Sequence, residues 1–490
     1  MSLQLEQNLI PADEKLLDKS AHILFVMPPE RPSNLPFAAA LEAKLKRSHS
    51  KYGDLLKNAL TMDLPNGALA SWLALDAKHS TFKRHTSLRK AVKTLLDEKP
   101  AQLVIAVFGD EAFRQAAARD AYYVALVNAQ VLPTRKSQKD KSKPLKSIKL
   151  LGVKLDDAAR IEAQVAGNTL CRLLTMLPPN ELTPQVYRDR IAKLAKVQGW
   201  QLEEYDMKKL QKLGAGAFVA VGQGSEPQDA AIVHLSYSPK SAKKHVALVG
   251  KGICFDTGGH NLKPARYMNG MHEDMNGSAV ALGILLAATE SRLPVRIDCW
   301  LPIAQNHIGP KAYKQNDVVT ALNGTTIEVV HTDAEGRMVL ADTLTLASRA
   351  KPEFIMDFAT LTGSMVAAVG TRYSGVLGNR PELLCKAVGA GAATGERVCA
   401  FPFDEDYDED IESVVADVKQ CTLDSEADHV LAARFLARFI EGDVPWLHVD
   451  LSAVNRKGGL GAVASDISGF GVGFGLRVIE DMLAGEKNGH

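Results

Sequence analysis

Short apolar runs alternate with amphipathic stretches along this chain, a pattern typical of α/β folds. In the N-terminal third, residues 21–27, 102–109 and 122–132 have the composition of buried strands, and residues 87–98 have the spacing of a helix. Four further runs predict buried strands at residues 245–250, 295–302, 354–361 and 446–451. Strands that alternate with helices favour a layered sheet with helices on both faces.

A change in composition separates two parts of the chain. Residues 135–149 contain seven basic residues and one acidic residue. We interpret this run as a solvated loop or linker, because such charge runs are usually hydrated; a nucleic-acid patch is the alternative. A helix is predicted directly after it, at residues 156–176. We therefore predict a smaller N-terminal α/β domain over residues 1–155 and a three-layer α/β/α domain with a mainly mixed sheet over residues 156–490.

Composition narrows the class of protein. The chain has 490 residues, of which 46% are hydrophobic and 23% charged, as in ordinary globular proteins. A formal net charge of +1 argues against a nucleic-acid or membrane-surface partner. The N-terminus lacks the pattern of a signal peptide, and the longest apolar run is about half of a membrane span. The six cysteines are scattered without a C-x-x-C motif, so we expect a soluble cytoplasmic protein.

Acidic and basic residues gather where two predicted strand regions end. They comprise four carboxylates and three cations: Asp256, Asp274, Asp333, Glu335, Lys251, Lys263 and Arg337. Ligands bind at the carboxyl ends of strands in open α/β sheets, so the two groups can converge on one cleft. Clustered carboxylates repel one another unless cations lie between them, which favours two divalent metal ions. The alternative is that each acid caps a helix or forms an ordinary ion pair.

The second group lies in a joint between two predicted elements. Residues 318–330 have the pattern of a hairpin, and residues 338–350 that of a helix. Three histidines lie near the acidic residues without an H-x-x-x-H spacing, namely His260, His272 and His331. We expect these histidines to support the site or to lie on a polar surface, and we do not expect them to bind metal.

Several segments resemble the leucyl aminopeptidases, the cytosol aminopeptidase family of dinuclear metallopeptidases. HTDAEGRMVLAD, from residue 331, is similar to the N-T-D-A-E-G-R signature of that family. VGKGICFDTGGHNLKP and MHEDMNGSA are similar to its other metal-site segments. Further matches are NELTP, GAFVAVGQGS, DFATLTGSMVAAVG, ATGERV and HVDLSAV. The resemblance spans roughly residues 160–480, and residues 1–150 share only the position and α/β character of the family's variable N-terminal domain.

The resemblance implies two divalent metal ions per chain, with zinc or manganese expected and magnesium or cobalt as alternatives. One ion would be held by Lys251, Asp256, Asp274 and Glu335. The other would be held by Asp256, Asp333 and Glu335. In an extended chain, residues two apart point the same way, so we expect Asp333 and Glu335 to face the metals together.

The resemblance also implies a function. Lys263 and Arg337 would be catalytic, and Arg337 would hold a bicarbonate ion. The pocket for the first substrate residue would be lined by Met271, Thr360, Gly363 and Ser452. The expected protein is a metal-dependent aminopeptidase of peptide catabolism, which releases N-terminal residues, leucine-like ones preferred, from peptide substrates. It would work as a homo-oligomer, and the family implies a hexamer.

The chain departs from the family pattern at three places. His331 replaces an asparagine, Asn276 replaces a glycine, and residues 424–436 replace a run that is often rich in glycine and threonine. None of these is an expected metal ligand, so the departures bear on pocket shape and substrate preference. Two other classes of protein were considered. A DNA-binding regulator with the same fold has only the basic run in its favour, and a metal-free structural subunit would have lost ligands that this chain retains.

Overall fold

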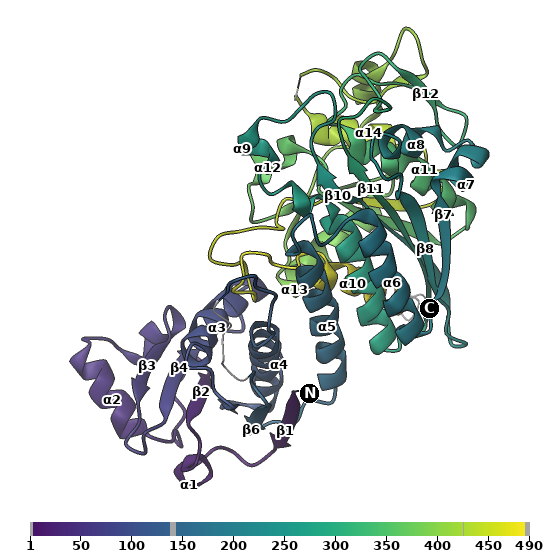
Figure 1. The fold of residues 1–490 in the computed structure, drawn as a ribbon. Coiled ribbons are helices and arrows are strands. Elements are labelled where there is room, and N and C mark those ends of the chain that lie inside the picture. Colours follow the sequence, from purple (N-terminus) through teal and green to yellow (C-terminus); the bar gives the residue numbers. More distant parts are fainter. Residues whose placement is uncertain (1–2, 138–143, 425, 486–490) are drawn as a thin grey trace. The chain divides into compact units, whose positions relative to one another are not determined.

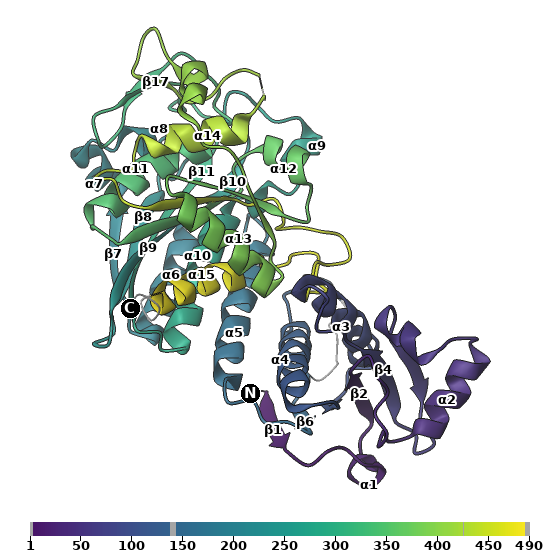
Figure 2. The same cartoon turned by 180° about the vertical axis from the view of Figure 1, so that it is seen from behind.

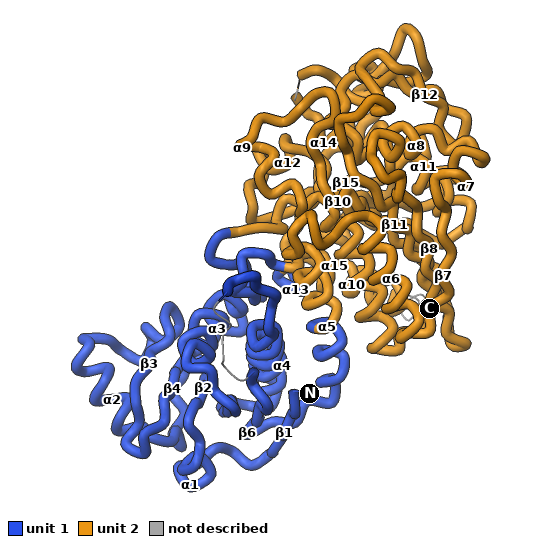
Figure 3. The backbone as a smooth tube through the Cα atoms, viewed as in Figure 1, with its two compact units in different colours: residues 1–165, 392–395, 457–468 blue, residues 166–391, 396–456, 469–490 orange. Residues whose placement is uncertain are grey.

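The structure is a computed structural model that describes residues 3–137, 144–424 and 426–485 (Figure 1). The chain forms two compact units (Figure 3). Unit 1 comprises residues 1–165, 392–395 and 457–468, and unit 2 comprises residues 166–391, 396–456 and 469–490. The expected domain boundary at residue 155 lies just before α5 (Ala158–Thr175), a helix that runs from unit 1 into unit 2.

Unit 1 is built on a sheet with the strand order β1-β6-β5-β2-β4-β3, in which β3 runs antiparallel to β4 and the other pairs are parallel. Its strands are β1 (Gln4–Asn8), β2 (His22–Met27), β3 (Leu60–Asp63), β4 (Leu69–Ala74), β5 (Gln102–Val107) and β6 (Ser147–Leu151). Its helices are α1 (Glu14–Leu17), α2 (Ala38–Arg47), the 3-10 helix η1 (Tyr52–Leu56), α3 (Thr81–Leu96) and α4 (Glu111–Asn128). Alternate residues of β2 pack against α3 and α4 on one face and α2 on the other.

Two expectations for unit 1 fail. The predicted strand at residues 122–132 is wrong, because most of that run belongs to helix α4. Seven consecutive residues of α4, from Ala121 to Val127, are buried, so the helix shows no amphipathic period and its tyrosines and valines imitate a strand. The basic run at residues 135–149 is not a loop throughout, because its end forms the start of β6. The middle of the run, residues 138–143, lies outside the described residues.

Unit 2 is built on a mixed sheet with the order β16-β15-β18-β14-β9-β11-β8-β7, with β10 paired to β11. Its strands are β7 (Gln201–Asp206), β8 (Ala231–Tyr237), β9 (Lys244–Gly250), β10 (Gly252–Asp256), β11 (Val295–Asn306), β14 (Phe354–Ala359), β15 (Ser374–Gly378), β16 (Val398–Ala400) and β18 (Trp446–Asp450). A second small sheet joins β12 (Val318–Thr320), β13 (Thr326–Glu328) and β17 (Val418–Lys419). The predicted hairpin is β12 and β13, and the four predicted strands are β9, β11, β14 and β18, so these predictions are confirmed.

Helices cover both faces of the large sheet, which gives the three-layer α/β/α arrangement (Figures 1 and 2). The helices of unit 2 are α6 (Pro184–Gln198), α7 (Met207–Leu213), α8 (Gly216–Gly222), α9 (Ala265–Met268), η2 (Met271–Met275), α10 (Asn276–Glu290), α11 (Glu335–Arg349), α12 (Gly363–Val369), α13 (Pro381–Thr394), η3 (Glu405–Ile411), α14 (Asp428–Ala437) and α15 (Val472–Ala484). Helices α6, α10 and α15 lie on one face, and α7, α8 and α11 on the other. None of the helices in the described part of the chain is long and apolar enough to cross a membrane.

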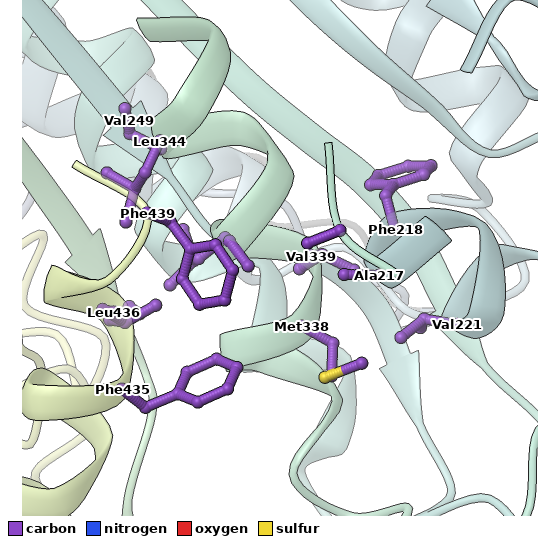
Figure 4. Packing of buried hydrophobic residues seen from close by; sticks show 14 of the residues in the cluster. Ala217, Phe218, Val221, Val249, Met338, Val339, Leu344, Phe435, Leu436 and Phe439 are labelled. Carbon is purple, nitrogen blue, oxygen red and sulfur yellow. The ribbon is translucent and has the colours of Figure 1, made fainter. Parts of the chain in front are cut away.

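Helix α11 is enclosed on several sides, which fixes its N-terminus. Figure 4 shows Met338, Val339 and Leu344 of this helix among side chains of α8, β9, α14 and the residues that follow α14. All three are fully buried, and their partners include Phe218 and Phe439. Because such cores are close-packed, α11 has little freedom to shift. The residues at its start are therefore held rigidly at the carboxyl edge of the sheet.

Candidate metal centre

Lys251 follows β9 directly and ends in a buried nest of oxygen atoms. Its Nζ lies 2.8 Å from Asp274 Oδ2 and 2.9 Å from Glu335 Oε1, and it donates a 3.0 Å hydrogen bond to the carbonyl of Thr360. The side chain is only 3% exposed. Gly336 leaves the room for it, since a Cβ at that position would stand 2.7 Å from Lys251 Nζ. The H-T-D-A-E-G-R segment therefore needs a glycine at this position, because the Lys251 side chain occupies the space that a Cβ would take.

Asp256 is the last residue of β10, and the chain then turns back through two glycines. Gly258 has a φ of +87°, a left-handed conformation that glycine adopts without strain, and its N–H donates to Asp256 Oδ1 at 2.8 Å. The turn delivers Lys263, whose Nζ lies 2.9 Å from Asp256 Oδ2 and 2.5 Å from Asp333 Oδ1. Lys263 therefore bridges the two acidic segments.

Asp274 lies in η2, just before α10, and is buried. Its Oδ1 accepts a 2.7 Å hydrogen bond from Thr360 Oγ1, beyond the end of β14. The neighbouring departure from the family pattern is structural, because Asn276 Nδ2 donates to Thr175 Oγ1 at 2.9 Å in α5. Asn276 thus joins the start of α10 to α5 and does not enter the site.

Asp333 and Glu335 converge by a different route from the one expected. The segment is not extended: Ala334 N–H donates to the carbonyl of His331 in a turn, and Glu335 is the first residue of α11. The alternation rule for strands therefore does not apply here. The tight turn followed by the first turn of a helix brings both carboxylates to the same place. His331 Nδ1 accepts a 3.3 Å hydrogen bond from Asp333 N–H, so this histidine supports the turn.

Asn306, at the end of β11, is a site residue that the sequence did not reveal. It is 1% exposed, and its Nδ2 donates to Asp256 Oδ1 at 2.9 Å and to Glu335 Oε2 at 3.3 Å. The same amide group donates to the carbonyl of Thr332 at 3.0 Å. An uncharged donor thus ties the two acidic segments together. No local sequence pattern marks this residue, because its role depends on the pairing of β11 with β10.

The carboxyl groups of Asp274, Glu335 and Asp333 resist ionisation. Burial raises the pKa of Asp274 to about 8, of Glu335 to about 7 and of Asp333 to about 6, and the charges of neighbouring carboxylates add to each shift. Burial acts against the charge of Lys251 and Lys263 as well, but the surrounding carboxylates outweigh it and raise the pKa of both amines well above the usual range. The two lysines supply only two positive charges to the four carboxylates, so further cations would stabilise the ionised acids.

This donor set fits divalent metal ions. One oxygen from each of Asp256, Asp333 and Glu335 lies within 4.8 Å of the others. Clustered carboxylate oxygens suit hard divalent cations, and a bound cation would oppose the mutual repulsion that helps to raise the pKa values of Asp333 and Glu335. The Lys251 amine contacts Glu335 of this group and joins it to Asp274. These five residues could hold two ions, with Lys251 as a ligand only after its ammonium loses a proton.

Arg337 does not present a free guanidinium. Its Nη1 donates a 3.0 Å hydrogen bond to the carbonyl of Gln420, and its Nη2 lies 2.8 Å from Asp428 Oδ1. Gln420 in turn accepts from His331 N–H, so it holds the same turn as the arginine. The charge of Arg337 is thus matched by a carboxylate of the chain. A bicarbonate ion does not fit beside this arginine while Asp428 is paired with Nη2.

All of the expected site residues border one cleft of about 1010 Å³ in unit 2. The expected ligands and catalytic residues line it, namely Lys251, Asp256, Asp274, Asp333, Glu335, Lys263 and Arg337. The four expected pocket residues also line it, namely Met271, Thr360, Gly363 and Ser452. Of the three histidines, His331 lines the cleft, whereas His260 Nδ1 lies 3.0 Å from the carbonyl of Tyr313. The individual roles of the cleft residues in catalysis, metal binding and substrate binding stay predictions.

Buried carboxylates and lysines at the carboxyl edge of a mixed α/β sheet are typical of metal-dependent hydrolases. The family comparison agrees. Residues 169–476 match the model of the cytosol aminopeptidase family, catalytic domain. The chain therefore belongs to the cytosol aminopeptidase family, and the resemblance noted in the sequence is confirmed.

Similar proteins share most of the fold. A probable cytosol aminopeptidase of Stutzerimonas stutzeri is 42% identical over 325 residues, which cover 65% of this chain and 65% of that protein. A probable cytosol aminopeptidase of Corynebacterium diphtheriae is 36% identical over 354 residues, with 71% and 70% covered. The chain thus matches slightly less than two thirds of the length of the first relative. Among solved structures, the bottromycin maturation enzyme BotP in complex with Mn is 28% identical, with a TM-score of 0.82 over 94% of this chain and 100% of that one.

Proposed function

We propose that this protein is a metal-dependent aminopeptidase that releases N-terminal residues from peptides. The observation that carries the proposal is the convergence of four carboxylates, three of them buried and Asp333 partly buried, and two lysines on one cleft. Family membership and the manganese complex of BotP support the choice of metal and reaction. We propose two divalent ions per chain, manganese or zinc, at the five residues described above. The names of the relatives support a cytoplasmic site of action, and all six cysteines, which lie among the described residues, are free.

When bound, two divalent ions supply Lewis acidity, which polarises a carbonyl and acidifies water. The residues of the chain attract the substrate and stabilise the charge that develops on it. Lys263 stays protonated between Asp256 and Asp333, and its partly exposed ammonium can donate to the carbonyl oxygen of a substrate as negative charge develops there. The buried carboxylates attract the positive amine of a peptide N-terminus. Asn306 holds two of these carboxylates in place, so little reorganisation accompanies the reaction.

The pocket proposed for the first residue favours an apolar side chain. Two hydroxyls that line it are already engaged, since Thr360 donates to Asp274 and Ser452 Oγ donates to the carbonyl of Tyr373 at 2.6 Å. Met271 adds an apolar wall. At Gly363 an added Cβ would meet no atom within 4 Å, so the backbone there leaves open space. We therefore propose a preference for leucine-like residues, because a buried polar side chain would find few free partners.

The experiment compares a free peptide with a blocked one. Purified protein loaded with manganese or zinc is mixed with leucyl-glycyl-glycine and with its N-acetylated form, and the released amino acid is measured. Release from the free peptide alone supports an aminopeptidase. Equal release from both peptides would contradict the role of the free amine.

We also propose a homohexamer, which rests on the family resemblance alone. Sedimentation equilibrium should then give a mass near six times the 52.9 kDa chain. A stable and active monomer would contradict this assembly.

A further inference from the structure

The segment that departs most from the family pattern supplies a charged group to the cleft. Asp428 is the first residue of α14 and lines the cleft beside Arg337. Its Oδ1 lies 2.8 Å from Arg337 Nη2, and its side chain is 21% exposed, whereas that of Arg337 is 3% exposed. The carboxylate thus reaches inward from the rim to a buried cation.

The backbone before Asp428 adopts a conformation that is unfavourable for a residue with a side chain. Ala427 has a φ of +50°, in the left-handed region that glycine prefers. The next two residues are well anchored: His429 N–H donates to Ser364 Oγ at 2.9 Å, and Val430 is buried. The strained turn therefore directs Asp428 toward the cleft, while the other residues of α14 pack within unit 2.

The guanidinium of Arg337 is already paired with an anion of the chain, Asp428. Nη1 donates to the carbonyl of Gln420 and Nη2 is paired with Asp428, whereas Nε has no hydrogen-bond partner among the described residues but is buried away from solvent. The carboxylate of Asp428 already balances the positive charge of Arg337, so a small anion from solution would have to compete with it for the guanidinium. A carboxylate that is already attached to the protein loses far less freedom than a free ion would, so it is the favoured partner.

We infer that Asp428 is a positioning residue that supplies, from within the chain, the anionic partner of Arg337, so that the enzyme binds no free bicarbonate at this arginine. Asp428 balances the positive charge of Arg337 and fixes the direction of its guanidinium in the cleft. A bicarbonate ion from solution would otherwise have to provide that negative charge. Its effect on hydrolysis rests on the proposed function, but its effect on anion binding does not.

The first test measures anion binding directly. Metal-loaded wild type, Asp428→Ala and Asp424→Ala are titrated with ¹³C-labelled bicarbonate and followed by NMR line broadening. Asp424 also lines the cleft, so its variant removes the same charge without touching the ion pair. Asp428→Ala should bind bicarbonate at least about tenfold more tightly than the other two proteins, because it alone frees a buried guanidinium. Equal affinity in all three proteins would overturn the inference.

The second test measures hydrolysis in buffer depleted of carbon dioxide. Wild type and Asp424→Ala should change by less than about twofold when bicarbonate is added. Asp428→Ala should be slowed about 10²-fold and should regain about tenfold with bicarbonate, the range expected when one charged group near the reaction is lost. Asp428→Asn should be slowed too. Strong activation of the wild type by bicarbonate would overturn the inference. If wild type hydrolyses no peptide, the proposed function fails, and the binding test still decides the role of Asp428.

Discussion

Replacing Lys251 by arginine separates two roles that the structure allows for this residue. In the structure the ammonium contacts Asp274, Glu335 and the carbonyl of Thr360, as an ordinary counter-ion would. As a metal ligand, the same nitrogen must first lose a proton, because an ammonium has no lone pair. Arginine keeps the positive charge but stays protonated at any working pH. A counter-ion role survives the substitution, whereas a ligand role does not.

The size of the effect follows from the surroundings of the amine. Its pKa lies above the usual value of about 10.4, so removal of the proton at pH 7.4 costs at least about 4 kcal/mol, or three pKa units at 1.36 kcal/mol each. Metal affinity at this nitrogen should therefore rise about tenfold for each unit of pH. In Lys251→Arg the fixed charge would oppose a divalent ion, and the backbone of Gly336 leaves no space for a bulkier group. Activity should fall by about 10³-fold or more, the scale of a lost electrostatic catalyst.

The assay combines metal stoichiometry by mass spectrometry with turnover of a leucyl anilide. Lys244→Arg is the matched control, because Lys244 is the first residue of β9, the strand that Lys251 follows, and it pairs with Glu353 at 2.9 Å, away from the cleft. The control should keep two ions and normal turnover, and Lys251→Arg should lose at least one ion. Two ions per chain with near-normal turnover in Lys251→Arg would refute the ligand role.

Three further predictions concern other parts of the site. Lys263→Ala should lower kcat by about 10²–10³-fold while both ions stay bound, as for a lost oxyanion donor; loss of metal would show that Lys263 is a structural group. Asn306→Ala removes hydrogen bonds to two carboxylates and should lower the free energy of unfolding by about 3 kcal/mol in urea titrations; an unchanged midpoint would contradict its bridging role. In the metal-free protein the folded pKa values of Asp274, Glu335 and Asp333 exceed the ordinary ones, so the folded state binds more protons. The stability that these groups contribute at acidic pH should be lost as the pH rises toward about 8, and metal should abolish this loss; a melting temperature with the same pH dependence in both forms would count against it.

The central strands could be predicted from the sequence because each is buried on both faces. Residues 245–250 and 354–361 are mainly apolar runs of the length that a parallel strand needs, and they form most of β9 and all of β14. The same reasoning failed for residues 122–132, since the C-terminal half of α4 is buried on all sides and has no polar face. The three-layer fold was therefore predictable, and the element type of one buried run was not.

The candidate ligands could be found because charged residues are conspicuous at the ends of apolar strands. Asn306 could not, since a neutral amide at the end of β11 has no local pattern, and its importance comes from β10 and α11, which are distant in sequence. The pairing of Arg337 with Asp428 was hidden for the same reason, as the two residues are 91 positions apart. The charged residues of a segment can be identified from the sequence, but the partners of a buried charge depend on tertiary packing.

Titration of metal-free protein with manganese, followed by release of leucine from a free peptide, tests the central claim most directly. The account predicts no turnover without metal, a rise in activity that reaches its plateau at two ions per chain, and no release from the N-acetylated peptide at any ratio. Full activity in protein shown by mass spectrometry to hold no divalent metal would contradict it.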